Sequence, residues 1–309
     1  MKRLLSISAA LLMLAGSASI RNYHGISEVE AGSGPDGKFT FAFLADIHLQ
    51  PELEAGEGFR RVIDLVNELE PDFVITGGDL IMDALKADYG RADSLYRMYE
   101  RLSGYFKMPV YNTIGNHDIL GWCGGRGISP SDSLFGKGMY EQRLGKTFYS
   151  FDHKGWHFII LDSVERGTEG GYTGRAGEEQ LEWIGQDLSM LDSETPVAVS
   201  THIPLVSVIP QLREGPGEGI SSSEVVANSR EVLELFRGYD LRLVLQGHLH
   251  LIEEIEVEGT TYITAGAVSG RWWRGPRRGV EEGFALIRVD GREFDWEYID
   301  SGWEADEGR

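Results

Sequence analysis

The sequence predicts an α/β fold, and three features support that prediction. From Phe39 onward, short apolar runs alternate with segments whose apolar residues recur at helical spacing, which is typical of sheets covered by helices. Hydrophobic residues make up 41% of the 309 residues, enough for a sizeable core. Cys123 is the only cysteine, so no intramolecular disulfide can form. We therefore expect a fold held together by its hydrophobic core.

The first residues are arranged like an export signal. Met1–Arg3 is positively charged, residues 4–14 are apolar, and residues 15–18 are small. A membrane anchor is the alternative, but about 11 apolar residues at ~1.5 Å each span only about half of a ~30 Å hydrocarbon core. Ser17 stands where a bacterial lipoprotein carries its lipidated cysteine, so no lipid anchor is indicated.

We accordingly expect a signal peptide at residues 1–18 and a flexible, glycine-containing leader at 19–38. The protein would be exported to the periplasm or the outside of the cell. After removal of the signal it would have no stable membrane anchor.

The elements of the domain are expected in the following order. A strand at 39–44 leads into a helix whose apolar residues lie three or four positions apart, at Phe59, Val62, Ile63, Val66 and Leu69. Short apolar runs then predict buried strands at 72–76, 109–114, 157–161, 196–200 and 241–245. Helical spacing returns at 178–191 and 224–236.

The C-terminal part is expected to be antiparallel. Strand-like segments lie at 252–257, 261–265, 285–289 and 294–299. Turn residues at Gly259 and at Asp290-Gly291 separate them at hairpin spacing. One domain therefore covers residues 39–300, and residues 301–309 form a frayed acidic tail.

Polar blocks follow five of the predicted strands, at the ends where open α/β sheets bind ligands. They are Asp46-Ile47-His48, Gly77-Gly78-Asp79, Gly115-Asn116-His117-Asp118, Thr201-His202-Ile203-Pro204 and Gly247-His248-Leu249-His250. Residues two apart on a strand point to the same face, so Asp46 with His48, and His248 with His250, would each direct two side chains to one point. A single aspartate here would suit a helix cap, and a single histidine a core position. Together the blocks predict a shared metal site.

In this order the blocks resemble the calcineurin-like metallophosphoesterase family, whose pattern is D-x-H, G-D, G-N-H-D/E, a lone H and G-H-x-H. The resemblance runs from about Phe39 to His250. It implies a four-layer αββα sandwich of two mixed β-sheets with flanking helices. It also implies two metal ions, one bound by Asp46, His48, Asp79 and His250 and the other by Asp79, Asn116, His202 and His248. His117 would be catalytic, stabilising the transition state and protonating the leaving oxygen.

The implied ligands contain no thiolate or tyrosinate, which suits two divalent or mixed-valence ions of Mn, Fe or Zn. Two divalent ions carry four positive charges, and two carboxylates with a bridging hydroxide remove about three, leaving a centre near +1 that favours a phosphate oxyanion. We therefore expect a metal-bridging hydroxide to hydrolyse a small phosphate mono- or diester.

The partner that orients His117 is left open between Asp83 and Asp118. Phosphoprotein phosphatases have an aspartate three residues after the G-D aspartate, and purple acid phosphatases have a tyrosine at the same offset, but this chain has Met82. His48 also separates it from the purple acid phosphatases. The nearest resemblance is to exported bacterial members similar to class III cyclic nucleotide phosphodiesterases.

Two alternative functions are considered. A nuclease of the same fold is disfavoured for two reasons. The 49 acidic and 29 basic residues give a net charge of −20, and the sequence has no long basic stripe. No nucleic-acid partner is therefore expected. A non-catalytic metal-binding relative is disfavoured because the seven ligands and His117 are all present.

Two segments lie outside the motifs. Arg271-Trp272-Trp273-Arg274, with Arg277 and Arg278, either contacts a charged, partly aromatic substrate or covers a sheet edge. Both interpretations stay open. Residues 121–138 form a glycine-rich insertion that follows the block ending at Asp118, and we expect its Cys123 to be a bystander.

Overall fold

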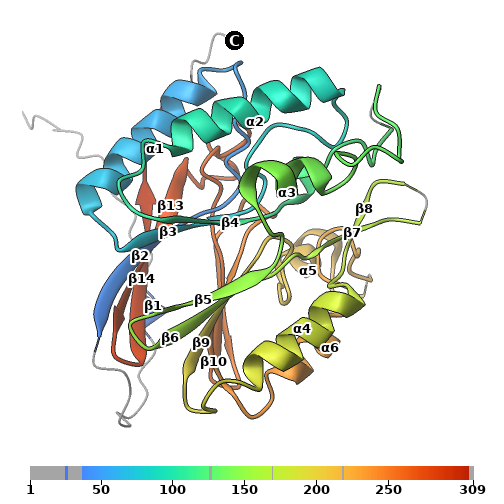
Figure 1. The fold of residues 1–309 in the computed structure, drawn as a ribbon. Helices are drawn as coiled ribbons and strands as arrows, with labels where there is room; N and C mark the ends of the chain where they lie inside the picture. The colour runs from blue at the N-terminus through green and yellow to red at the C-terminus, as the bar shows by residue number, and fades with distance from the viewer. Residues whose placement is uncertain (1–24, 27–36, 125–126, 169, 218, 306–309) are drawn as a thin grey trace, which may run out of the picture.

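The computed structural model describes residues 25–26, 37–124, 127–168, 170–217 and 219–305. Two six-stranded mixed sheets face each other, and helices cover their outer faces (Figure 1). This arrangement confirms the expected four-layer αββα sandwich. The signal peptide, most of the leader and the last four residues of the acidic tail lie outside the described residues.

The first sheet has the strand order β1-β14-β13-β2-β3-β4. In that order its strands are Gly25–Ile26, Glu293–Asp300, Gly283–Asp290, Lys38–Leu44, Phe73–Gly77 and Val110–Thr113. The second sheet has the order β11-β12-β10-β9-β6-β5. Its strands are Glu253–Val257, Thr260–Thr264, Asp240–Gln246, Pro196–Thr201, Trp156–Ile160 and Tyr149–His153. A separate two-stranded ribbon joins β7 (Val164–Arg166) to β8 (Tyr172–Gly174).

The central strands are apolar on both faces, which is why each sheet can be covered on both sides. In β2, Phe39, Phe41 and Phe43 face the second sheet, whereas Ala42 and Leu44 face the helices. Strands β9 and β10 alternate in the same way. The molecule therefore has one core between the sheets and further apolar layers under the helices.

Helices α1 (Ala55–Leu69) and α2 (Tyr89–Ser103) cover the first sheet, and α4 (Glu178–Leu188) and α6 (Ser229–Leu235) cover the second (Figure 1). The short helices are α3 (Gly138–Leu144), α5 (Ile209–Glu214) and the single 3-10 turn η1 (Asn116–Asp118). The described residues include no helix with the length and apolar composition to cross a bilayer.

Every predicted strand is present, with each end within two residues of the expected position. The helix expected at 224–236 is shorter, because the Asn228 side chain binds both backbone polar groups of Ala176 and the chain turns there before α6 begins. The sequence patterns did not predict α2, α3, α5, β5, β7 or β8.

The two antiparallel hairpins expected in the C-terminal part are present, but they do not form one antiparallel unit. The two hairpins join different sheets: β13 and β14 extend the first sheet, where β13 runs antiparallel to β2. The β11–β12 hairpin instead extends the second sheet, and β12 pairs with β10 in parallel. In addition, Gly25 and Ile26 of the expected leader pair with β14.

Candidate metal centre

The polar blocks of both sheets meet at the carboxyl ends of five strands. Asp46 and His48 follow β2, Asp79 follows β3, and Asn116 with His117 lies in η1 directly after β4. On the second sheet His202 follows β9, and His248 and His250 follow β10. The structure therefore brings together all eight predicted site residues.

The backbone that presents these side chains is unusual. Asp46, His48, Asp79, His248 and His250 have φ values between 44° and 71°. Residues with a side chain seldom adopt this left-handed region, and such residues gather at functional sites. The strand alternation expected to align Asp46 with His48 does not apply, because both lie in the loop after β2. His248 and His250 also direct their side chains to two different groups.

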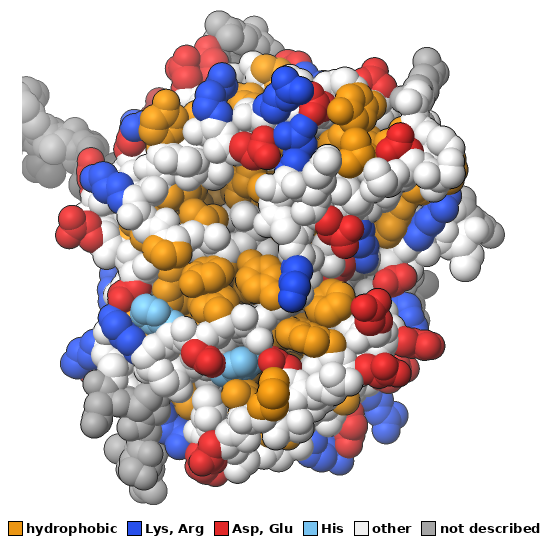
Figure 2. All heavy atoms as spheres, viewed as in Figure 1, with side chains coloured by type: hydrophobic (Ala, Val, Ile, Leu, Met, Phe, Trp, Pro, Cys, Tyr) orange, Lys and Arg blue, Asp and Glu red, His pale blue; other side chains and the backbone are white. Residues whose placement is uncertain are grey.

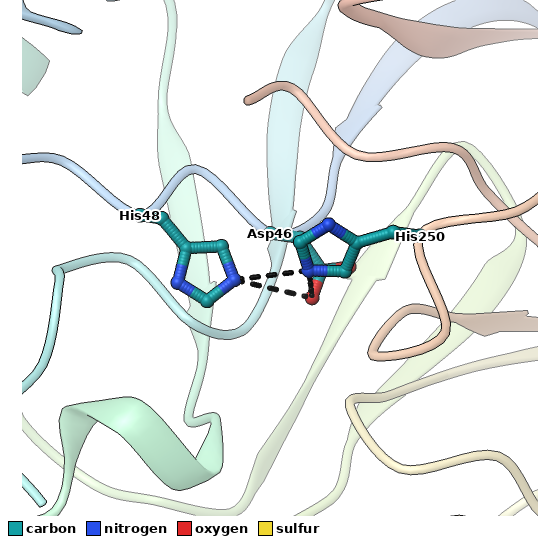
Figure 3. A group of neighbouring side chains, drawn as sticks. All are labelled: Asp46, His48 and His250. Atoms are coloured by element: carbon teal, nitrogen blue, oxygen red, sulfur yellow. Dashed lines mark hydrogen bonds and ion pairs between the residues drawn. The ribbon is translucent and has the colours of Figure 1, made fainter. Parts of the chain in front are cut away.

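The first group comprises Asp46, His48 and His250 (Figure 3). The two imidazoles point at each other, with Nε2 atoms 3.0 Å apart. Asp46 Oδ1 lies 3.2 Å from Nε2 of His250 and 3.8 Å from Nε2 of His48. All three residues are buried. Three ligand atoms thus converge from the loops that follow β2 and β10.

The second group comprises Asp79, His202 and His248. Nε2 of His202 lies 3.1 Å from Oδ2 of Asp79 and 3.2 Å from Nδ1 of His248. Asn116 Oδ1 lies 3.1 Å from the same His202 nitrogen, so its amide oxygen faces this group.

Asp79 lies between the two groups. Its Oδ2 atom is 3.6 Å from Nε2 of His48 on one side and 3.1 Å from Nε2 of His202 on the other. Its Oδ1 atom accepts the backbone N–H of His117 at 2.8 Å. A Cβ on Gly115 would lie 2.1 Å from the Asp79 backbone nitrogen, so only glycine permits this approach.

Backbone carbonyls orient three of the histidines. Nδ1 of His202 donates to the Gly77 carbonyl at 2.8 Å, and Nδ1 of His250 donates to that of Gly270 at 2.7 Å. Nε2 of His248 donates to the Ser223 carbonyl at 2.8 Å. In the neutral imidazoles, these contacts place the proton on Nδ1 of His202 and His250 and on Nε2 of His248, which leaves the opposite nitrogen for a metal. The sequence contained no signal for these carbonyls.

The two buried aspartates are held ionised. Burial alone would raise the pKa of Asp46, but His250 and His202 outweigh it and lower the pKa to about 2. Burial would likewise raise the pKa of Asp79. The histidines His202, His117 and His48 outweigh it and hold that pKa well below its usual range. Both side chains are thus available as anionic ligands.

The pKa is lowered in two of the histidine ligands and raised in a third. Burial lowers the pKa of His48 well below its usual value, and burial together with His202 lowers the pKa of His248 to about 4. Burial would also lower the pKa of His202, but Asp79 outweighs it and raises the pKa to about 9. In the metal-free chain His202 therefore carries the proton that a metal would displace.

The residues fit a pair of metal ions. Asp46 Oδ1, one of the converging ligand atoms, is buried without a hydrogen-bond partner among the described residues. Two imidazole nitrogens 3.0 Å apart, next to an ionised carboxylate, also form an arrangement that a cation would stabilise. Carboxylate, amide and imidazole donors suit Mn, Fe or Zn.

His117 lies beside the centre, with its ring centroid 5.0 Å from that of His48 and Nε2 4.0 Å from Asp79 Oδ2. Its Nδ1 atom faces Asp83 at 3.0 Å. Asp118 instead accepts the backbone N–H groups of Leu80, Ile81 and Gly115. Of the two candidates for orienting His117, only Asp83 contacts it.

Burial would lower the pKa of His117, but Asp79 and Asp83 outweigh it and raise the pKa to about 9. In the metal-free chain the imidazole therefore carries a proton at neutral pH. Such a group, with one nitrogen directed at the centre, can act as a general acid.

The two tryptophans of the arginine-rich segment have different positions. Trp273 is buried against α1, and its indole N–H donates to the carbonyl of Ile47 at 2.9 Å, which supports the loop that carries Asp46 and His48. Trp272 instead borders the first group, with its ring centroid 5.1 Å from that of His250. Trp273 thus has a structural role, and contact of the segment with a substrate stays a prediction.

Tyr172 on β8 borders the second group, with its ring centroid 6.1 Å from that of His248. The sequence patterns did not single out this residue. Cys123 is exposed and unpaired.

Comparison with known proteins agrees with this geometry. The sequence model of the calcineurin-like phosphoesterase family matches residues 39–251. A probable cyclic nucleotide phosphodiesterase of Rhodococcus erythropolis is 25% identical over 238 residues, which are 72% of this chain and 68% of that protein. A transmembrane protein with a metallophosphoesterase domain from Danio rerio is 36% identical over 84 residues, but these are only 26% of this chain and 18% of the relative.

Among solved structures, a dimetal phosphatase from Danio rerio has the same fold, with a TM-score of 0.60 and 15% identity over 84% of this chain and 98% of that one. The family match covers the predicted strands from 39–44 to 241–245, all five polar blocks and both groups of ligand atoms. The chain therefore belongs to the calcineurin-like phosphoesterase family, and with it to the hydrolases of phosphate esters.

Proposed function

We propose that this chain hydrolyses a small phosphate mono- or diester with two metal ions. The observation that carries the proposal is the position of Asp79 between two groups of buried ligand atoms. The first ion would be bound by Asp46, His48, Asp79 and His250, and the second by Asp79, Asn116, His202 and His248. The fit of the donor atoms supports Mn, Fe or Zn as the ions.

When bound, the two ions would lower the pKa of a water nucleophile and neutralise the phosphoryl oxygens. The chain's own contribution is to fix that chemistry in place. Asp79 sets the separation of the two groups, and the carbonyls of Gly77, Gly270 and Ser223 fix the imidazole orientations. His117, held by Asp83, donates a proton from Nε2 to the leaving oxygen.

Charge supports a small substrate over a nucleic acid. The net charge of −20 repels a polyanion. On the face shown in Figure 2, basic side chains are interspersed with acidic ones and form no continuous basic surface. A nuclease would need such a surface to bind the backbone. The proposed export signal would place the activity in the periplasm or outside the cell.

The test is turnover by the purified chain on p-nitrophenyl phosphate and bis-p-nitrophenyl phosphate. We expect activity that a chelator abolishes and that Mn or Zn restores, whereas Ca does not. Preference for the second substrate would identify a diesterase. Absence of turnover on both, with full metal content, would leave the non-catalytic relative. Cleavage of DNA at low salt in preference to both esters would favour the nuclease.

A further inference from the structure

Arg277 differs from the other arginines of its segment. Arg271, Arg274 and Arg278 are exposed, whereas Arg277 is half-buried. Its guanidinium lies 5.1 Å from the ring centroid of Trp272, in a cation–π contact. Among the described residues no carboxylate is within salt-bridge distance of it, in a chain that has 20 more acidic than basic side chains. An arginine partly removed from water is normally paired, so this one lacks its partner.

A chain of contacts places Arg277 near the first metal group. The Trp272 ring beneath it has its centroid 5.1 Å from that of His250 and 6.1 Å from that of His48. Burial lowers the pKa of Arg277, whereas the negative charge of Asp46 raises it. An effect of Asp46 is expected if the guanidinium faces the first metal group.

Other donors around Arg277 also lack acceptors. The indole N–H of Trp272 is buried with no acceptor among the described residues. Arg213 on α5 acts on Arg277 as a neighbouring positive charge. Arg213 is paired with Glu224 through Nη2, but its buried Nε has no acceptor. Two positive charges thus lie near one another, and only that of Arg213 is met by a carboxylate, from Glu224.

We propose that Arg277, supported on Trp272, binds a second anionic group of the substrate, a carboxylate or a phosphate, while the ester phosphate occupies the metal centre. This inference rests on the proposed function and specifies its substrate class: phosphate esters that carry a further negative charge. A guanidinium binds either kind of group through two parallel N–H donors. Arg277 would therefore determine specificity without taking part in the chemistry.

The test uses binding without turnover. Alkylphosphonates and ω-phosphonocarboxylates of equal chain length are titrated calorimetrically into the metal-loaded protein at one ionic strength. The two series differ only in the terminal carboxylate. The wild type should bind the carboxylate series more tightly, and the chain length with the largest difference reports the reach of Arg277.

Arg277→Ala should weaken binding of the best phosphonocarboxylate about 10- to 100-fold while changing the alkylphosphonate by less than about twofold. Arg277→Lys keeps the charge but not the planar guanidinium. Its affinity for the phosphonocarboxylate should lie between those of the wild type and Arg277→Ala. Arg274→Ala is the matched control, because Arg274 is exposed in the same segment and borders a separate cavity of about 950 Å³ with Trp303 and Leu53. It should retain the wild-type preference.

Three results would overturn the inference: equal affinity of the wild type for the two series, an unchanged preference in both Arg277 variants, or an equal loss in Arg274→Ala. Failure of the proposed function would look different, since the wild type would then turn over neither nitrophenyl ester, whatever its affinity for the two phosphonate series. Metal content and Tm of each variant should match the wild type, which separates loss of the subsite from loss of the fold.

Discussion

The Nδ1 atom of His117 lies 3.0 Å from the Oδ1 atom of Asp83, on the side of the ring that faces away from the metal groups. The carboxylate fixes the ring orientation and helps to hold the imidazole protonated. An acid must carry its proton to act, so activity should fall as pH rises through the pKa of His117.

Asp83→Asn should therefore lower kcat and move the basic limb of the pH–rate profile to lower pH, because the lost charge lowers the pKa of His117. Thermal stability should change little. A pH–rate series with the wild type beside the variant measures this. An unchanged basic limb would show that Asp83 does not tune His117.

Asp118→Asn is the matched control. Its carboxylate accepts backbone N–H groups from Leu80, Ile81 and Gly115, and an amide must place its NH₂ against one of these donors. The expected cost is about 1–3 kcal/mol in the free energy of unfolding, seen as a lower Tm. The basic limb of the profile should keep its position.

His117→Ala should keep both metals but lose roughly 10²–10⁴-fold in kcat. The loss should be smaller for nitrophenyl esters than for alkyl esters, since a good leaving group needs no proton. The measurement is kcat for both ester types, together with metal content. Equal losses for the two types would contradict a proton-donating role and would favour electrostatic stabilisation alone.

Asp79→Ala should lose both metal ions, because this carboxylate lies between the two groups of ligands. Asp46→Ala should affect mainly the first ion, since Asp46 Oδ1 faces His48 and His250, whereas Oδ2 accepts the backbone N–H of His248. Elemental analysis of the purified variants distinguishes the two patterns. Full metal content in Asp79→Ala would show that the carboxylate does not bridge the ions.

The sequence predicted the strands and the site residues because both depend on local patterns. Apolar runs such as Phe39–Leu44 identify strands, and polar residues directly after them identify the ligand-binding edge of the sheet. Helix α2 was missed because its face consists of Leu95, Tyr96 and Tyr99 among many charged residues. The pairing of β12 with β10 depends on which sheet receives the hairpin, which no local pattern encodes.

Finer features of the site depend on tertiary contacts. Asp83 follows Met82 and Asp118 follows His117, so the sequence leaves both as candidates to orient His117. Only the folded loops show that Asp83 contacts the imidazole. Trp272 and Trp273 are adjacent and chemically identical, yet one borders the metal groups and the other is buried under α1. Spacing alone could not separate either pair.

Metal binding should release a proton. The pKa of His202 is raised to about 9 in the metal-free chain, so at pH 7 the imidazole is protonated, and a metal must displace that proton from Nε2. His48 and His248, with lowered pKa values, should release none. Affinity should therefore rise with pH up to about 9.

Calorimetric titration of Zn or Mn into the metal-free protein, in two buffers of different ionisation enthalpy, measures the released protons. At least one should be released near pH 7, and fewer from His202 as the pH approaches 9. Metal binding with no proton released at pH 7 would show that His202 is already neutral.

Glu282 should destabilise the fold at neutral and alkaline pH. The side chain is buried, and neither carboxylate oxygen has a hydrogen-bond partner among the described residues. Burial, with smaller contributions from Glu281 and Asp300, raises the pKa of Glu282 from 4.5 to about 7. The folded state thus binds this proton more tightly than the unfolded state does, so the stabilisation is fully present below about pH 4.5 and is lost as pH rises through 7.

Glu282→Gln removes the titrating proton while keeping the shape. The variant should exceed the wild type in the free energy of unfolding by about 1–3 kcal/mol at pH 8, because the wild type must then bury an ionised carboxylate and the variant buries a neutral amide. The difference should shrink as pH falls toward 5. Denaturant unfolding across that range measures it, with Glu281→Gln as the control, because Glu281 is the exposed neighbour and loses the same charge. A gain that is equal in both variants would mean that net charge, rather than burial of Glu282, sets the pH dependence.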